Sequence, residues 1–246
     1  MRKLLTVMSA LAALALAVPV QAADGTYNLN WDSCTGPIDK TVIAGQTPVN
    51  LYASVIGLDV PNSGYQVMVI FGNSTTRQVP DAWAFDAPGC QGSSFVTLNH
   101  LAPAAVVKTC PSLQGILQSL QIKDVAKVNT SAMPYDPLLL RATIANAYAD
   151  GVLAPSAATR YFLANILFDH TFSVVGATTP GTECGGVEQP ICFATVASSF
   201  IELSTGIEFN FGGGGNRGVT VNGSAGCPAS PAQTTTWGAI KSQYRN

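Results

Sequence analysis

The stretch from Thr159 to Val174 reads TRYFLANILFDHTFSV, and this stretch decides the fold class. Its apolar residues and one histidine recur at every second position: Phe162, Ala164, Ile166, Phe168, His170, Phe172 and Val174. A period of two places these side chains on one face of a strand. We therefore expect a long strand with an apolar face, in which His170 is a structural histidine near the strand end.

The same alternation recurs along the chain, and short groups of turn residues separate the segments. The expected strands are Thr26–Trp31, Val49–Leu58, Tyr65–Phe71, Leu138–Tyr148, Ile191–Leu203, Ile207–Phe211 and Gly218–Asn222. Turns are expected at Pro61–Gly64 and at Ser204–Gly206, the second as a short hairpin. One stretch, Ser112–Gln121, has the spacing of a helix. About eight strands at this spacing predict an all-β, two-layer antiparallel β-sandwich.

The composition narrows the class of protein. The 246 residues hold 12 Lys and Arg against 14 Asp and Glu, so 11% are charged, and 47% are hydrophobic. Soluble domains average about 25% charged residues. Intrinsic disorder needs low hydrophobicity and a high net charge, and nucleic-acid binding needs a basic surface. The composition therefore argues against an intrinsically disordered protein and against a nucleic-acid-binding protein. The sequence also contains no cofactor-binding motif.

The first 22 residues have the pattern of a secretory signal. Arg2 and Lys3 precede an apolar run from Leu4 to Val18. Val20 and Ala22 then supply the small or branched residues that a signal peptidase needs for a cut after Ala22. We therefore expect a signal peptide at 1–22, a sandwich domain at 23–227 and a tail at 228–246. Since no later segment is apolar and long enough for a membrane helix, the mature chain is expected outside the cell, at the cell surface or in the periplasm.

All six cysteines follow the expected cut, which predicts three disulfides in an oxidising compartment. Six cysteines allow 15 pairings, and the sequence alone does not choose among them. Proximity along the chain favours Cys184–Cys192 and Cys90–Cys110, which leaves Cys34–Cys227. The spacing of these cysteines does not fit a zinc site.

Two glutamates are the strongest candidates for chemistry. A three-residue loop at Ser204–Gly206 would place Glu202 opposite Glu208 on the outer face of a hairpin, with carboxylates about 5 Å apart. Such a pair suits a solvated sheet face, a cation site or a retaining glycosidase. A Ser-His-Asp site would have to use His100 or His170, and no G-x-S-x-G motif supplies a nucleophile. Trp31, Trp83 and Trp237 could stack on sugars, although alternating aromatic residues usually belong to a core.

The C-terminal residues form a separate candidate element. After a linker from Pro228 to Thr234, the apolar residues Trp237, Ile240 and Tyr244 follow helical spacing, with Lys241 and Arg245 beside them. The spacing predicts a short amphipathic helix. It is a candidate docking tail, either for the chain's own sandwich or for a partner.

Several short motifs together resemble a group of secreted proteins known mainly from the genomes of environmental bacteria. They are Trp31–Cys34, Pro80–Phe85 with Gly89-Cys90, Asp169-His170 before Cys184, Pro190–Cys192 and Thr236–Lys241. The resemblance implies a disulfide-containing sandwich of immunoglobulin-like or jelly-roll type. It transfers no catalytic residue, since no activity is established for the group.

These observations favour a non-catalytic structural or binding module of the cell surface or the extracellular space. The alternative is a carbohydrate-binding or carbohydrate-hydrolysing protein that uses Glu202 and Glu208. Expected partners are a cell-surface protein, a polysaccharide or further copies of the chain. Sheet edges with few charged residues favour pairing with other strands.

Overall fold

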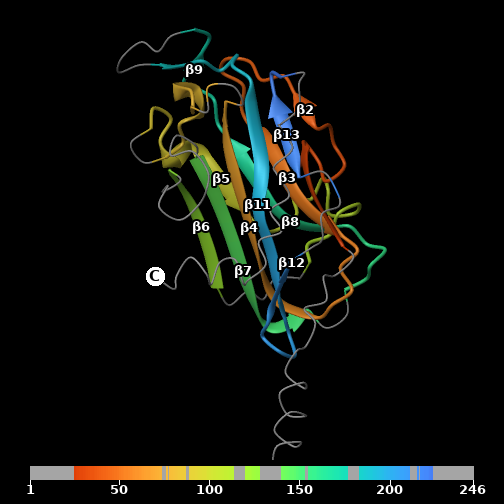
Figure 1. Ribbon diagram of the computed structural model, residues 1–246. Helices are drawn as coiled ribbons and strands as arrows, with labels where there is room; N and C mark the ends of the chain where they lie inside the picture. The colour runs from red at the N-terminus through yellow and green to blue at the C-terminus, as the bar shows by residue number, and fades with distance from the viewer. Residues whose placement is uncertain are drawn as a thin grey trace, which may run out of the picture.

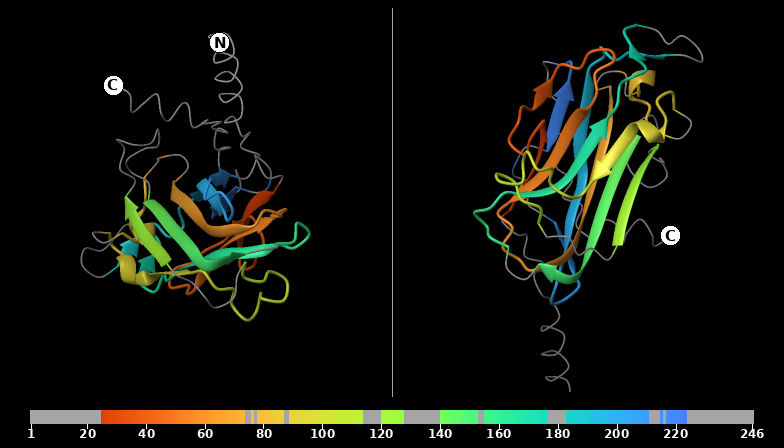
Figure 2. Two further views of the ribbon diagram at one scale, coloured as in Figure 1. Left: turned by 90° about the horizontal axis from the view of Figure 1, so that it is seen from below. Right: turned by 180° about the vertical axis from the view of Figure 1, so that it is seen from behind.

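The computed structural model describes residues 25–73, 76, 78–86, 89–113, 120–127, 140–152, 155–176, 183–210, 215 and 217–223. Within these residues the chain folds into two facing β-sheets (Figure 1). Figure 2 shows the two layers from below and from behind. The predicted two-layer β-sandwich is confirmed. The expected leader, 1–22, and tail, 228–246, lie outside the described residues.

The first sheet, sheet A, has four antiparallel strands in the order β1, β3, β8, β5. Their bounds are Thr26–Trp31, Val49–Ile56, Tyr161–Phe168 and Val96–Asn99. A small parallel pair, β9 (Ser173–Val174) and β10 (Cys184–Gly185), follows at one end of the sandwich. The short 3₁₀ helices η1 (Asp81–Trp83) and η2 (Ser93–Phe95) precede β5.

The second sheet, sheet B, has the order β2, β13, β11, β4, β7, β6. Their bounds are Asp39–Lys40, Gly218–Val221, Ile191–Glu202, Asn62–Asn73, Leu140–Val152 and Leu120–Lys127. A further strand, β12 (Glu208–Asn210), pairs with the end of β11. All pairs are antiparallel except β13 with β2.

The core lies between the sheets and is built from alternate strand positions, as a period of two requires. In β1, Tyr27, Leu29 and Trp31 are fully buried. Phe193 of β11 lies at the centre. Its ring contacts the rings of Trp31, Phe71, Trp83 and Phe168 at centroid distances of 5.0–5.5 Å. These contacts join both sheets through one aromatic cluster.

A β-bulge changes the face assignment in β8. The pairing with β3 shifts between Ala53 and Ser54, so that Leu163 joins the main core while Phe162 leaves it. Phe162 instead packs in a second cluster with Tyr52, Val106, Cys34 and Cys110. The expectation that Phe162 shares the core face with Ala164 is therefore wrong. An inserted residue reverses the alternation on one side of a bulge.

Two local predictions also fail. The helix expected over Ser112–Gln121 is wrong at both ends, because Ser112 bridges Phe162 and Leu120 opens strand β6. Residues 114–119 lie outside the described part. The turn expected at Pro61–Gly64 is largely strand, since β4 begins at Asn62. The chain instead crosses between sheets after β3, with a positive φ of 84° at Gly57.

The disulfide pairing differs from the expected one. Cys34 is bonded to Cys110 and Cys90 to Cys184, so all three expected pairs are wrong. Proximity along the chain misleads because β5 carries the chain away from Cys90 before it reaches Cys110. Cys192 is also disulfide-bonded, and Cys227, the sixth cysteine, lies outside the described residues. Disulfides of this kind are typical of exported proteins.

No helix in the described part of the chain is long and apolar enough to cross a membrane.

Candidate functional site

The candidate site lies at the end of the sandwich where β8 stops. The Asp169 carboxylate accepts hydrogen bonds from the backbone N–H and the hydroxyl of Thr171. This local turn ends the strand at Phe168, because an Asp side chain that bonds two residues ahead competes with the sheet ladder. These hydrogen bonds also lower the pKa of Asp169, which therefore remains charged.

His170 lies directly inside this turn and is fully buried, as predicted for a structural histidine. Its ring centroid lies 4.3 Å from that of Trp83 and 5.4 Å from that of Phe85. Its Nδ1 atom lies 2.9 Å from the Ser173 hydroxyl, and the Gln91 side-chain amide donates to the same hydroxyl at 2.6 Å. We assign the Ser173 proton to the bond with Nδ1, which leaves the His170 proton on Nε2.

Burial keeps His170 neutral. It lowers the pKa to about 4, against smaller opposing effects of the Asp169 carboxylate and the Ala82 backbone carbonyl. A serine beside a neutral histidine has the composition of a nucleophile and its base. However, Ser173 and Gln91 are buried as well, so a substrate has no access to the hydroxyl. The cluster therefore holds the end of the sandwich together.

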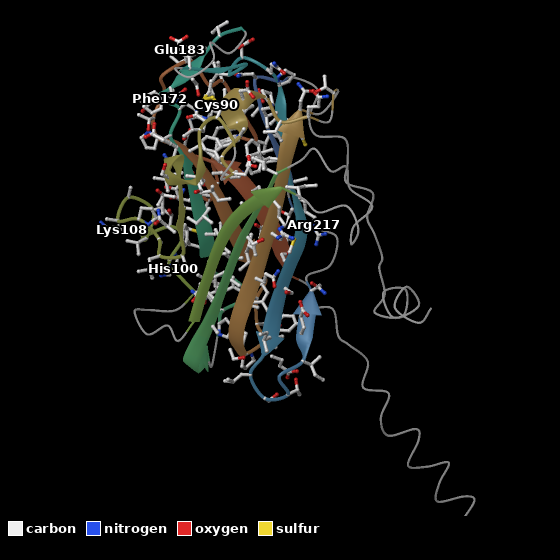
Figure 3. The ribbon with its side chains drawn as sticks, turned by 90° about the vertical axis from the view of Figure 1, so that its left-hand side faces the viewer. Cys90, His100, Lys108, Phe172, Glu183 and Arg217 are labelled. Carbon is white, nitrogen blue, oxygen red and sulfur yellow. A yellow bond between two sulfur atoms is a disulfide. The ribbon has the colours of Figure 1, made fainter. Side chains whose placement is uncertain are left out.

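A disulfide and a backbone ladder reinforce the same end. The Cys90–Cys184 bond joins the segment after η1 to β10. The Cys184 backbone N–H donates to the Phe172 carbonyl, and the Val187 N–H donates to that of Val174. Residues 172–176 and 184–188 thus run side by side. In Figure 3, Phe172, Cys90 and Glu183 gather at this end of the molecule.

The two side-by-side segments present apolar and acidic side chains to solvent. Phe172 is 47% exposed and Val175 is 67% exposed. Glu183 and Glu188 are exposed too, and Glu188 accepts a hydrogen bond from the Gly176 backbone N–H. We call Phe172, Val175, Glu183 and Glu188 the tip surface. Together with Asp169, all charged side chains described in residues 169–176 and 183–189 are acidic.

The sequence did not predict this surface, because it placed Phe172 and Val174 in one strand with the core residues. The signal was present in the Asp-His-Thr sequence, since an Asp or Asn two residues before Thr often closes a turn. With the strand ended at Phe168, the period-two assignment no longer applies to Phe172 or Ser173. The partners Gln91 and Ser173, by contrast, meet only through the tertiary fold.

The expected acidic pair does not form. In the hairpin, Glu208 lies opposite Ile201, and the Glu202 backbone N–H bonds to the Ile207 carbonyl. The register is thus shifted by one residue, which places neighbouring side chains on opposite faces of the sheet. The Glu202 carboxylate accepts hydrogen bonds from Ser204 and Thr205 instead, and these bonds lower its pKa.

The hypotheses of a cation site and of a glycosidase required the Glu202 and Glu208 carboxylates to lie opposite each other. Both are wrong, because Glu208 lies opposite Ile201 instead. Trp31 and Trp83 are fully buried, so neither ring is open to a sugar. His100 lies in the loop after β5, below the tip surface in Figure 3. Among the described residues, no three His, Cys, Asp or Glu side chains are grouped as metal ligands would be.

Comparison with known proteins concerns the fold. No protein-family model matches the chain, and no curated protein matches its sequence. Among solved structures, a type II cohesin domain from the cellulosome of Acetivibrio cellulolyticus is similar, with a TM-score of 0.41 and 11% identity over 80% of this chain and 95% of that one. A non-cellulosomal cohesin from Archaeoglobus fulgidus gives a TM-score of 0.35 and 8% identity over 80% and 89%. At these values the likeness concerns the course of the strands and no binding residue.

Proposed function

We propose that this chain is an exported, non-catalytic binding module that contacts a protein partner through its tip surface. The observation that carries the proposal is the exposure of Phe172 and Val175 on a segment that is otherwise tightly held. Large apolar side chains gathered at one exposed place are typical of interaction sites. Here Phe172 and Val175 lie on a segment that runs beside the segment with Glu183 and Glu188.

The base of the tip surface supports this use. The Cys90–Cys184 disulfide, the Ser173 hydrogen bonds and the His170 ring fix the backbone beneath the exposed side chains. A surface that is ordered before binding loses little conformational entropy on association. Binding energy from Phe172 and Val175 is then retained rather than spent on ordering a loop.

The charges indicate the chemistry of the partner. Glu183, Glu188 and Asp169 give the tip surface a negative potential, which favours a protein segment with apolar side chains and Lys or Arg. An anionic polymer would be repelled by the same carboxylates. We therefore expect a basic, apolar peptide segment as the ligand.

Selection from a random 12-residue peptide display library tests the proposal directly. The mature protein should enrich peptides that combine aromatic or aliphatic residues with Lys or Arg. The Phe172→Ser, Val175→Ser double variant should lose these peptides. The matched control is Ile201→Ser with Ile207→Ser, since both residues are exposed in the hairpin formed by β11 and β12. Peptides that bind the Phe172/Val175 variant as well as the wild type would contradict the proposal.

A further inference from the structure

The face of sheet B that points away from sheet A is a second surface of interest, separate from the tip surface. In β4, Val67, Val69 and Phe71 belong to the core between the sheets. Met68 and Ile70 alternate with them, so they point away from sheet A. Nevertheless Met68 is only 9% exposed and Ile70 only 7%. Neither residue belongs to a described core cluster.

The neighbouring strands repeat this observation. Ser199 of β11 alternates with the core residue Phe200 and therefore faces outward, yet it is buried. Thr143 of β7 lies opposite Met68, and its Oγ1 atom is buried without a hydrogen-bond partner among the described residues. We call Met68, Ile70, Thr143, Cys192 and Ser199 the outer face of sheet B. Side chains on an open sheet face remain accessible to water, so burial here indicates a cover.

Cys192 identifies which segment provides the cover. It alternates with the core residues Ile191 and Phe193, so its side chain also points to the outer face. Cys192 is disulfide-bonded. Four other cysteines form the pairs Cys34–Cys110 and Cys90–Cys184 and are therefore not its partner. Within the chain, Cys227 is the one cysteine that remains for it. A disulfide between Cys192 and Cys227 would bring the first residues of the segment 228–246 to the outer face of sheet B.

We propose that the outer face of sheet B is the docking surface of the chain's own C-terminal segment, residues 228–246, tied down by a Cys192–Cys227 disulfide. The apolar side chains of Trp237, Ile240 and Tyr244 provide the contact with Met68 and Ile70. The segment contains no acidic residue, and its two charged residues are Lys241 and Arg245.

The distances allow this arrangement. Cys192 lies opposite Gly72, four residues along β4 from Met68. At about 3.3 Å per residue this is about 13 Å. The ten residues from Cys227 to Trp237 can span up to about 35 Å. A tether of this length holds the segment at an effective concentration on the order of millimolar, so even a weak contact keeps the face covered.

Oxidation of Met68 by hydrogen peroxide tests the proposal in the full mature chain. In the Trp237→Ser, Ile240→Ser, Tyr244→Ser variant, we expect Met68 to be oxidised several-fold faster than in the wild type. Met133, the other methionine after the expected leader, reports the oxidant dose. The matched control replaces Gln233, Ser242 and Gln243 of the same segment by alanine, and should leave the Met68 rate unchanged.

Two results would overturn the proposal. The first is a rate of Met68 oxidation that does not change in the triple variant. If this rate rises in Tyr135→Ser instead, residues 128–139 provide the cover. The second is a peptide map, made without reduction, in which Cys192 is bonded to a cysteine other than Cys227. A map that joins Cys192 to Cys227, together with faster Met68 oxidation, supports it.

Discussion

His170 shows how a single buried side chain links the stability of the site to pH. Its pKa falls from 6.5 to about 4 because burial disfavours the charged ring. The unfolded chain therefore takes up a proton before the folded one does. The stabilisation from a neutral His170 is complete above about pH 6.5 and is lost as the pH falls towards 4.

We expect the free energy of unfolding to decrease by about 2 to 3 kcal/mol between about pH 7 and pH 4.5, since each pKa unit is worth about 1.4 kcal/mol. Urea unfolding with intact disulfides measures this decrease. In His170→Gln, which cannot titrate, the slope over this range should flatten although the variant is less stable overall. An equal slope in both proteins would show that another group is responsible.

Glu202 is a second single residue whose pKa is set by its neighbours, here in an exposed turn. Hydrogen bonds from Thr205 and Ser204 hold its pKa below the ordinary value. We expect an NMR titration of the Glu202 carboxyl carbon to show this low midpoint, and the Thr205→Val variant to raise it. A Glu202 midpoint that is the same in Thr205→Val as in the wild type would contradict this assignment.

At the scale of elements, the Cys90–Cys184 disulfide should stabilise the tip surface more than the rest of the fold. It links residues 94 apart, and its loss costs on the order of 4 kcal/mol in the chain-entropy model. In Cys90→Ser with Cys184→Ser, we expect faster hydrogen exchange at residues 172–176 and 184–188. Removal of Cys34–Cys110, 76 residues apart, is the matched control and should affect residues 100–111 instead. A uniform increase in exchange in both variants would contradict this assignment.

Elements whose pattern depends on neighbours in sequence could be predicted, and β1 is predicted to the residue. A bulge cannot be read from alternation, so the prediction for β8 fails at Phe162, where the partner strand shifts by one residue. The Glu202 hairpin fails for a related reason, because its register depends on how the turn closes. The disulfides fail because each joins segments that only the folded sheets bring together.

The candidate site divides in the same way. Burial of His170 agrees with its place in the apolar pattern, although β8 ends two residues before it and the Asp169 turn positions the ring. The exposure of Phe172 does not follow from the pattern, because it depends on the Asp169 turn that ends the strand at Phe168. Likewise, the contact of Ser173 with Gln91 joins residues 82 apart. Such a pair has no local signature.

At the scale of the whole molecule, Phe193 should be essential to stability and Phe172 should not. Phe193 is fully buried among rings from both sheets, so Phe193→Ala should cost about 3 to 5 kcal/mol. Phe172 contacts only the ring of Phe95 among the described ring pairs, so Phe172→Ala should cost less than about 1 kcal/mol. Urea unfolding of both variants at neutral pH measures the difference. Equal losses would mean that the exposed end belongs to the core.

This contrast separates binding from folding and so permits the most direct test of the account. The measurement is the affinity of a peptide enriched in the library selection, determined by calorimetry for the wild type and for the Phe172→Ser, Val175→Ser variant. We predict that the variant unfolds at nearly the same urea concentration but loses at least tenfold in affinity, equal to about 1.4 kcal/mol. An affinity that is unchanged in this variant would contradict the claim that the tip surface is the binding site.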